Sequence, residues 1–189
     1  MCSTLKALAI CSRGFYHFGV GPLLYRIKTG GCMEVRLALL EEAEQLWLVR
    51  NNAIRHGCRN VYDKKTLIAW TPDQMPEGYP QAIAHNPFFV IDDPVSQLAV
   101  ATGFLDISSG SVEAIFTLPE FEGQGIASLI LAAIKQEAKQ RGFAKLTLAS
   151  TPNASEFYER NGFTLIGESL YPSQLAQANL RCMDMVYYL

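Results

Sequence analysis

The fold is decided by the stretch SVEAIFTLPEFEGQGIAS, which covers Ser111–Ser128. Its first part, up to Leu118, is rich in Val, Ile, Phe and Thr, a composition typical of a β-strand. Two glycines, Gly123 and Gly125, then precede an apolar run with the three-and-four spacing of a helix. The stretch therefore predicts a strand that runs through a glycine turn into a helix.

The glycine turn has the properties of an anion-binding site. The first turn of a helix leaves backbone N–H groups without intrahelical partners, and the helix dipole adds partial positive charge there. Glycine lacks the β-carbon that would hold a bulky phosphate away from these groups. We therefore expect a phosphorylated ligand to sit on Gly123 to Ser128.

Three phosphate-binding designs compete for this segment. A phosphate-loop nucleotide hydrolase needs Lys followed by Ser or Thr at the start of the helix, where this chain has Ile126 and Ala127. A dinucleotide-binding fold needs an acidic residue about 20 positions farther on, but the expected strand Ala144–Ala149 contains no Asp or Glu. The remaining design binds the pyrophosphate of coenzyme A.

Two segments of the chain, EGQGIA at Glu122–Ala127 and TPNASEFYERNGF at Thr151–Phe163, resemble the GNAT-type N-acetyltransferase superfamily. The sequence EGQGIA at Glu122–Ala127 is similar to the acetyl-CoA loop of that family, Gln/Arg-x-x-Gly-x-Gly/Ala, except that Glu122 stands where Gln or Arg is usual. The sequence TPNASEFYERNGF at Thr151–Phe163 resembles the family segment Asn-Ala-x-x-Phe-Tyr-Glu-x-x-Gly-Phe almost letter for letter. The two matches occur in the expected order, and the resemblance covers residues 33–189.

The resemblance implies a fold, an activity and a set of site residues. The fold is of the α/β class, α+β type, with a mixed, mostly antiparallel central sheet flanked by helices and acetyl-CoA in a splay between central parallel strands. The activity is transfer of an acetyl group from acetyl-CoA to a primary amine by direct attack on the thioester, and Tyr158 protonates the departing thiolate. The implied cofactor-binding residues are Ile115, Phe116, Thr117, Glu122, Gly123, Gln124, Gly125, Ile126, Ala127, Ser128 and Asn153.

Glu113 is the candidate base for the amine. Alternate residues of a strand share a face, so Glu113 is expected on the same face as Ile115 and Thr117. Acyl transfer requires the amine to lose a proton, and Glu113 matches an acidic residue that many members of the family carry six positions before the proline of this strand. Two ordinary alternatives remain, namely Glu113 as a solvent-facing strand carboxylate and Tyr158 as a core tyrosine with a satisfied hydroxyl.

Composition excludes several other classes of protein. The chain has 189 residues, of which 49% are hydrophobic, an ordinary length for one domain with a real core. Its net charge of −2 gives no electrostatic reason to expect nucleic acid, and no apolar run approaches the ~18 residues of a membrane span. Five cysteines and three histidines are scattered without metal-ligand spacing. We therefore expect free thiols, no metal site and a reducing, cytoplasmic compartment.

The chain divides into an N-terminal extension, residues 1–32, and an acetyltransferase-like domain, residues 33–189. Asn153 is expected to cap a short helix with Glu156 as its capping-box partner, and Asn161-Gly162 to end that helix in left-handed conformations. A loop is expected over Thr71–His85, where proline and glycine are frequent. The other expected elements are helices at Leu40–Arg55, Thr66–Trp70 and Gly125–Gln140 and strands at Val35–Ala38, Phe88–Asp92, Leu98–Ile107, Ser111–Leu118, Ala144–Ala149, Phe163–Gly167 and Arg181–Tyr188.

Three classes of function remain open. The first is an acetyl-CoA-dependent N-acetyltransferase that acts on a primary amine of a small molecule or protein. The second is a non-catalytic module or sensor that holds acyl-CoA without turnover, which the departure at Glu122 favours. The third is a nucleotide-dependent enzyme of another fold, for which the residues named above are lacking. No motif names the amine acceptor, and a homodimer is a further expectation because proteins that resemble this one are commonly dimers.

Overall fold

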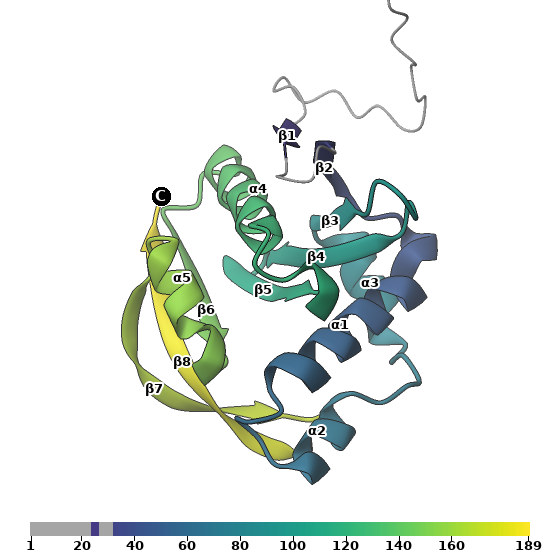
Figure 1. The fold of residues 1–189 in the computed structure, drawn as a ribbon. Helices are drawn as coiled ribbons and strands as arrows, with labels where there is room; N and C mark the ends of the chain where they lie inside the picture. The colour runs from purple at the N-terminus through teal and green to yellow at the C-terminus, as the bar shows by residue number, and fades with distance from the viewer. Residues whose placement is uncertain (1–23, 27–31) are drawn as a thin grey trace, which may run out of the picture.

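The computed structural model describes residues 24–26 and 32–189. These residues form one eight-stranded sheet with helices on both faces, in the strand order β1-β2-β3-β4-β5-β6-β8-β7 (Figure 1). Neighbouring strands are antiparallel, except that β5 and β6 are parallel. The predicted fold, a mixed and mostly antiparallel sheet flanked by helices, is confirmed.

The elements have the following bounds. The strands are β1 (Leu24–Arg26), β2 (Cys32–Leu37), β3 (Phe88–Asp92), β4 (Ala99–Asp106), β5 (Ser111–Thr117), β6 (Lys145–Ser150), β7 (Thr164–Ser173) and β8 (Ala178–Tyr188). The α-helices are α1 (Ala43–Gly57), α2 (Lys64–Trp70), α3 (Gly78–His85), α4 (Ile126–Gln140) and α5 (Ser155–Arg160). Short 3-10 turns are η1 (Leu40–Glu42), η2 (Pro119–Phe121) and η3 (Pro152–Ala154).

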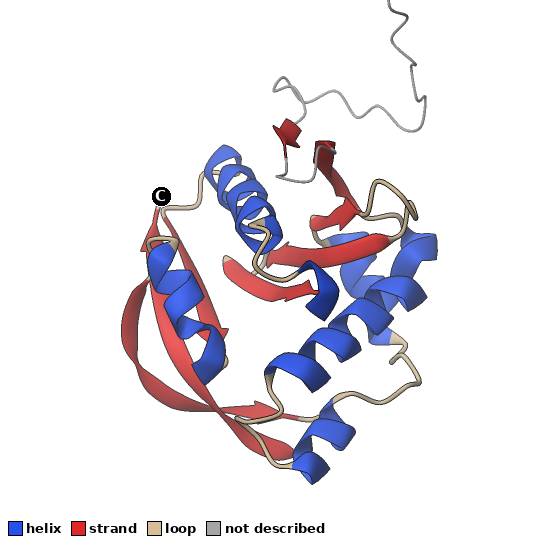
Figure 2. Ribbon diagram, in the orientation of Figure 1, coloured by secondary structure: helices blue, strands red, loops and turns tan. Residues whose placement is uncertain are grey.

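Helices cover both faces of the half of the sheet that contains β3, β4 and β5 (Figure 2). On one face, Ile130 and Ile134 of α4 belong to a buried cluster with residues of all three strands. On the other face, Leu46 of α1 and Ile83 of α3 pack against β3 and β4. Because both faces are covered, the first four residues of β3 are all buried. Of the two other helices, α5 contributes Tyr158 to the cluster on the α4 side, and α2 contributes Leu67 to a small cluster with Ile54 of α1.

An ion-pair network fixes the start of α1 against the sheet. The guanidinium of Arg36 on β2 donates to Glu42 in η1 at 2.5 Å and to Asp92 of β3 at 2.6 Å. Glu42 also accepts a hydrogen bond from the backbone N–H of Leu39 at 2.7 Å. The network sets the direction in which α1 leaves the sheet, and the far end of α1 reaches the functional site.

The sheet opens between its two parallel strands. The register of β5 and β6 contains a single residue pair, Ser111 with Thr147, next to a hydrogen bond from the Thr147 N–H to the Gly110 carbonyl at 3.1 Å. Beyond this point β5 continues to pair with β4, whereas β6 pairs along its whole length with β8. The strands therefore diverge toward their C-terminal ends, and the predicted splay is present (Figure 1).

A β-bulge interrupts the pairing of β4 with β5. Thr102 pairs with Phe116, and Phe104 pairs with Glu113. Gly103 therefore lies opposite the two residues of β5 between Glu113 and Phe116. Because β5 has one more residue than β4 at this point, side chains that follow the bulge in β5 lie on the opposite face from the one that regular alternation predicts.

The inversion corrects the face predicted for Glu113. Phe116 packs against the cluster of Ile54 on α1, and Glu113 shares its face because their β4 partners are two residues apart. Ile115 packs instead against the cluster of α4, and Thr117 lies on that face too. The prediction that Glu113, Ile115 and Thr117 share a face is wrong, since plain alternation takes no account of a bulge.

Most expected elements occur in the predicted order, with three differences in extent. The segment Thr71–His85 is not a loop throughout, because its last eight residues form α3. Pro80 is the third residue of α3, where a backbone N–H has no intrahelical acceptor, so proline is tolerated there. The hairpin of β7 and β8 is longer than expected, and the first strand of the domain begins at Cys32 rather than Val35.

The N-terminal extension lies largely outside the described residues. Its described part is β1, which pairs antiparallel with β2 through Leu24–Glu34, Tyr25–Met33 and Arg26–Cys32. The boundary at residue 32 stays a prediction, as does the assignment of residues 1–32 as a separate segment.

The bulge predicts a specific sensitivity at Gly103. A β-carbon there would lie 2.8 Å from Cγ2 of Ile130 and 2.9 Å from Cγ1 of Ile115, so Gly103→Ala forces the α4 contact to shift. We expect a loss of about 1–3 kcal/mol in the free energy of unfolding, measured by chemical denaturation. Gly78→Ala is the matched control, because a β-carbon at Gly78 meets nothing within 4 Å. An unchanged denaturation midpoint for Gly103→Ala would mean that the core absorbs the methyl group.

Candidate functional site

The glycine turn is built as an open helix start. Gly123 and Gly125 have φ angles of +73° and +81°, in the left-handed region that favours glycine. Gly125 is the N-cap of α4, and its carbonyl accepts from the N–H groups of Ser128 and Leu129 at 3.1 and 3.2 Å. The N–H groups of the first two helical residues precede these bonds and have no helical acceptor. The open helix start on which the predicted anion site depends is therefore present, and the anion site itself stays a prediction.

A cavity of about 690 Å³ extends from this turn into the splay between β5 and β6. It is lined by two motifs that are far apart in the sequence, the glycine turn and the segment around Tyr158. The predicted site residues that line it are Ile115, Phe116, Thr117, Glu122, Gly123, Gly125, Ile126, Ala127, Ser128, Asn153 and Tyr158. Two predicted site residues, Gln124 and Glu113, do not line the cavity. Gln124 is exposed, and its side chain donates to the Glu120 carbonyl at 3.4 Å.

The cavity has a wall that the sequence patterns did not indicate. The last turns of α1 contribute Ile54, Gly57 and Cys58, and the end of α2 contributes Trp70. These residues lie in an ordinary amphipathic helix and its successor, so no local motif distinguishes them from core residues. Burial raises the pKa of the Cys58 thiol to about 11, which keeps it protonated and unreactive near neutral pH.

The edge of β5 that faces the splay has unpaired backbone groups. The N–H of Leu118 donates to Val100 of β4 at 2.9 Å, so the adjacent N–H of Thr117 points away from β4. The side-chain hydroxyl oxygen of Thr117 is also buried without a partner in the described part of the chain. Thr117 lies on the cavity wall, so its N–H is available to a polar ligand, whereas its hydroxyl oxygen is wholly buried and unsatisfied.

Tyr158 is held rigidly in an aromatic cluster. Its ring packs edge-on against Phe157 at 5.0 Å and Phe163 at 5.7 Å between centroids. The side chain is 8% exposed, and its hydroxyl has no hydrogen bond to any residue that the structure describes. Burial raises the pKa of Tyr158, and the carboxylate of Glu113 raises it further. The hydroxyl is therefore protonated near neutral pH and keeps its hydrogen for a ligand.

Glu113 lies near this site on the opposite face of the sheet from Ile115. Desolvation raises the pKa of the Glu113 carboxyl, contact with Ser111 opposes the rise, and the charge of Asp106 supports it. The side chain is also exposed to solvent, which limits the size of the rise but leaves its direction. The carboxylate is close enough to affect the titration of Tyr158.

Asn153 contacts the end of α1 instead of capping α5. Its amide donates to the Gly57 carbonyl at 3.1 Å, and its Oδ1 lies 3.9 Å from the thiol of Cys58. Pro152 begins a 3-10 turn, so α5 starts later with Ala154 as its N-cap and no side-chain cap. The predicted capping box is therefore wrong, and Glu156 pairs with Arg160 at 2.9 Å.

The predicted end of α5 is half correct. Gly162 has a φ of +86°, as expected of the residue that ends the helix, whereas Asn161 has a φ of −95° and is not left-handed. One glycine is sufficient to reverse the chain there.

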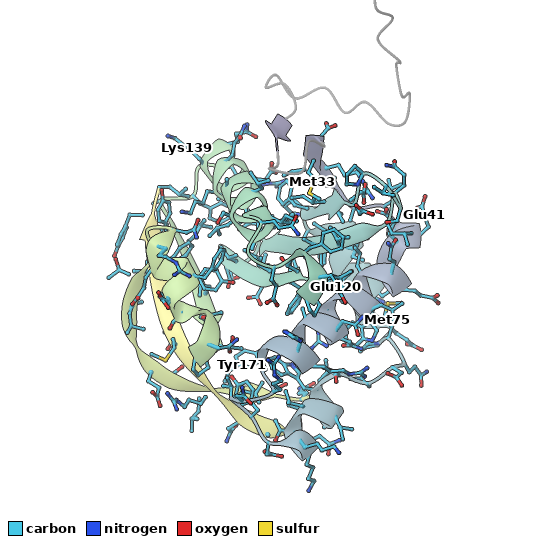
Figure 3. All side chains as sticks on the ribbon, in the orientation of Figure 1. Met33, Glu41, Met75, Glu120, Lys139 and Tyr171 are labelled. Atoms are coloured by element: carbon cyan, nitrogen blue, oxygen red, sulfur yellow. The ribbon has the colours of Figure 1, made fainter. Side chains whose placement is uncertain are left out.

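Acidic residues border the phosphate end of the cavity. Glu122 is exposed on the rim, so its side chain is free to turn toward solvent. Figure 3 shows Glu120 beside α1, on the η2 turn that connects β5 with the glycine turn. The opposite wall carries Arg160, which is exposed. Among the residues that line the cavity, the groups suited to an anion are therefore the N–H groups of the glycine turn and the side chain of Arg160.

The sequence matches a family model described as an acetyltransferase (GNAT) domain over residues 58–188. This match spans more than half of the chain and includes both the glycine turn and Tyr158. The chain belongs to the GNAT acetyltransferase family.

Solved structures share the fold of this GNAT domain. The GCN5-related N-acetyltransferase of Rhodopseudomonas palustris is 18% identical, with a TM-score of 0.74 over 82% of this chain and 94% of that chain. The PaiA N-acetyltransferase of Thermoplasma acidophilum, solved with coenzyme A, is 16% identical, with a TM-score of 0.62 over 83% and 99%. YncA of Salmonella typhimurium, solved with acetyl-CoA, is 17% identical, with a TM-score of 0.56 over 83% and 94%. A search of the curated proteins finds no significant match.

Three further observations concern the described part of this GNAT domain. None of its helices has the length and apolar character that crossing a bilayer requires. Within residues 24–26 and 32–189, no three His, Cys, Asp or Glu side chains are gathered as metal ligands would be. Cys58 and Cys182 are buried free thiols, as predicted for these two positions.

Proposed function

We propose that this GNAT-family protein is an acetyl-CoA-dependent N-acetyltransferase that acetylates a primary amine by direct attack on the thioester. The observation that carries the proposal is that one cavity is lined by both the open start of α4 and Tyr158. The pyrophosphate binds to the N–H groups of Gly123–Ala127, and the pantetheine arm lies along β5 at Ile115, Phe116 and Thr117. The complexes of PaiA with coenzyme A and of YncA with acetyl-CoA support this arrangement by analogy.

The reaction needs two proton transfers. The amine nitrogen attacks the thioester carbonyl carbon, and the C–S bond breaks as the N–C bond forms. Glu113, directly or through a water, takes the proton that the amine loses, and Tyr158 donates a proton to the departing sulfur. The products are the N-acetylated amine and coenzyme A.

The two proton transfers are coupled by charge. The ionised Glu113 carboxylate is one cause of the raised pKa of Tyr158. When Glu113 takes the amine proton, this negative charge is removed, and loss of a proton from Tyr158 becomes less costly. Removal of the amine proton therefore prepares the acid for the leaving group.

Direct attack is favoured over a covalent acetyl-enzyme. Cys58 is the cavity-lining thiol that would serve as a nucleophile, and burial raises its pKa to about 11. The thiolate required for attack is therefore scarce near neutral pH.

A second candidate is an acyl-CoA-binding module without turnover, for which the exposed Glu122 on the cavity rim is the favouring observation. A thermal-shift comparison of acetyl-CoA, coenzyme A, NAD and ATP tests ligand class, because a ligand that binds the native state raises the melting temperature. Release of free thiol from acetyl-CoA with a panel of amines separates an enzyme from a binding module. Stabilisation by acetyl-CoA without amine-dependent thiol release would favour the module.

The first prediction concerns the glycine turn. Gly125→Val should abolish binding of acetyl-CoA, because a branched side chain does not adopt a φ of +81° and would cover the N–H groups of α4. Gly142→Val is the matched control, since Gly142 has a φ of +78° at the other end of α4 and equally empty surroundings. Calorimetry should show lost affinity in the first variant only. Equal affinity in both would locate the pyrophosphate elsewhere.

Glu122 gives a complementary test of the same site. Glu122→Gln removes a negative charge from the rim of the phosphate site, so affinity for acetyl-CoA should hold or rise. A large loss of affinity in calorimetry would instead assign Glu122 a structural role in the turn.

A further prediction concerns the acid. Tyr158→Phe should lower turnover about 10²- to 10⁴-fold with little change in acetyl-CoA affinity, because only the hydroxyl is removed. Tyr187→Phe is a suitable control, since Tyr187 also packs on Phe163, at 5.3 Å, but does not line the cavity. Near-normal turnover of Tyr158→Phe in a chemistry-limited assay would make Tyr158 a packing residue.

The pH profile tests the base. Desolvation raises the pKa of Glu113, so the ionised, proton-accepting form is lost as the pH falls through that raised value. Glu113→Gln should reduce the rate less at high pH than at neutral pH, because a neutral amine needs no base. Glu120→Gln, an exposed change outside the splay, should leave the profile unaltered. A defect of Glu113→Gln that is the same at every pH would assign Glu113 to substrate positioning.

A further inference from the structure

Arg50 on α1 is a buried cation without a carboxylate partner in the described part of the chain. Its side chain is only 7% exposed, yet the ion pairs of residues 24–26 and 32–189 do not include it. One nitrogen, Nη1, donates to Oδ1 of Asn51 at 2.7 Å and to the Trp70 carbonyl at 3.0 Å. Nε and Nη2 donate to no described residue. Burial lowers the pKa of the guanidinium to about 10, so it remains charged near neutral pH.

The unpaired nitrogens of Arg50 reach accessible space. The wholly buried side-chain polar atoms without a partner are the hydroxyl oxygens of Thr102 and Thr117, and no nitrogen of Arg50 is among them. The Nε and Nη2 groups therefore retain a little accessible surface. Arg50 itself is not among the residues that line the cavity, so a ligand reaches these groups only at its edge, beside Trp70 and Phe116.

Aromatic rings surround the guanidinium and connect it with the cavity. Its central carbon lies 4.4 Å from the ring centre of Trp47, 5.8 Å from that of Trp70 and 5.9 Å from that of Phe116. The rings of Trp70 and Phe116 belong to residues that line the cavity in the splay. Arg50 therefore lies beside the aromatic end of that cavity.

The guanidinium of Arg50 and the carboxylate of Glu113 lie on the same face of the sheet. Phe116, beside Arg50, and Glu113 share that face because of the bulge. Their partners on β4 are two residues apart, which corresponds to about 7 Å along the strand. The guanidinium beside Phe116 and the carboxylate of Glu113 therefore lie on the same side of the sheet, at different positions along β5.

Burial of a lone charge is expensive, and the surrounding rings compensate only in part. Removing a cation from water is costly unless an anion accompanies it, and a cation over an aromatic ring recovers only a part of that cost. The free protein thus has a charge whose best partner is absent from its described residues. A monoanion that enters the cavity supplies that partner.

We infer that Arg50 binds the carboxylate of the acceptor, so that the acceptor is a small amino acid that carries its reactive amine and a free carboxylate. The inference rests on the proposed acetyltransferase function and narrows its substrate class. The two unpaired N–H edges of a planar guanidinium match the two oxygens of a carboxylate. One guanidinium neutralises one carboxylate, whereas a phosphate dianion would leave a negative charge among the rings. The N-terminal amine of a protein is disfavoured because its neighbouring carboxyl is an amide.

The experiment measures free-thiol release from acetyl-CoA by the full chain with matched acceptors. Each common amino acid, and each ω-amino acid from glycine to 6-aminohexanoate, is compared with its carboxamide and its phosphonate analogue. The preferred carboxylates should have a KM at least about tenfold lower than their carboxamides, as expected for hydrogen bonds to a charged partner. If the carboxamide or phosphonate analogue is acetylated as efficiently as the carboxylate, this comparison in the wild-type protein alone overturns the inference.

Variants separate recognition from structure. Arg50→Gln should raise KM for the carboxylate about 10- to 100-fold and leave KM for the carboxamide within about twofold. Arg50→Lys, which retains charge but not the two-pronged geometry, should fall between Gln and the wild type. Arg59→Gln is the control, because Arg59 is an exposed arginine just beyond the same helix. Stabilisation by acetyl-CoA should persist in all three variants, which checks that they fold.

The outcomes distinguish the inference from the proposed function. Equal effects of Arg50→Gln on both acceptors would make Arg50 a structural residue. Efficient acetylation only of amines without a carboxylate would overturn the inference but support the acetyltransferase. An absence of thiol release with every amine would overturn both.

Discussion

The single residue pair between β5 and β6 is the constraint on which the site depends. Backbone N–H and C=O groups must be paired or solvated, so two parallel strands cannot separate inside a dry core. Here each strand satisfies one edge elsewhere, β5 with β4 and β6 with β8, and the cavity is lined by the end of β5 and by Thr151 just after β6. The loop before α4 and the start of α5 both reach that cavity. The separation of β5 from β6 thus creates a site with unpaired backbone groups between two well-packed halves of the sheet.

The bulge in β5 adds a second asymmetry, between the two faces of the sheet. Without it, Glu113 would lie with Ile115 and Thr117 on the side of α4. With it, Glu113 and Phe116 face α1, and the cofactor-side residues face α4. In the proposed reaction, acetyl-CoA therefore approaches from the α4 side and the acceptor from the α1 side. Gly103 makes this possible because it leaves room for Ile115 and Ile130 where a larger residue would meet both.

The sequence predicted the fold and the open start of α4 because both depend on local patterns. The strand, glycine turn and helix over Ser111–Ser128 form a continuous segment, and the left-handed angles of Gly123 and Gly125 follow from residue type. The wall made by α1 was not predictable in this way. Residues such as Cys58 line the cavity only because α1 crosses the sheet at a particular angle, which long-range contacts determine.

The errors have the same origin. Strand alternation predicts the face of Glu113 correctly only in the absence of a bulge, and a bulge depends on a partner strand. The capping motif at Asn153 is local, but a tertiary hydrogen bond to Gly57 takes its side chain. Trp70 and Arg50 gave no signal either, since each resembles an ordinary residue of an amphipathic helix. Their role arises where α1, α2 and β5 meet.

Charge balance connects these separate elements into one reaction site. In the proposed complex, an acceptor ammonium near Glu113 and an acceptor carboxylate on Arg50 give four charges that sum to zero. Loss of the ammonium proton to Glu113 neutralises both members of that pair and leaves the carboxylate–guanidinium pair intact. The neutral amine is then the nucleophile, and Tyr158 no longer lies near the negative charge that helps raise its pKa. In this proposal the zwitterion supplies the buried guanidinium of Arg50 with an anion that the described residues lack and that an amine alone would not bring. The proposed acceptor therefore completes the charge balance of the site before the acetyl group moves.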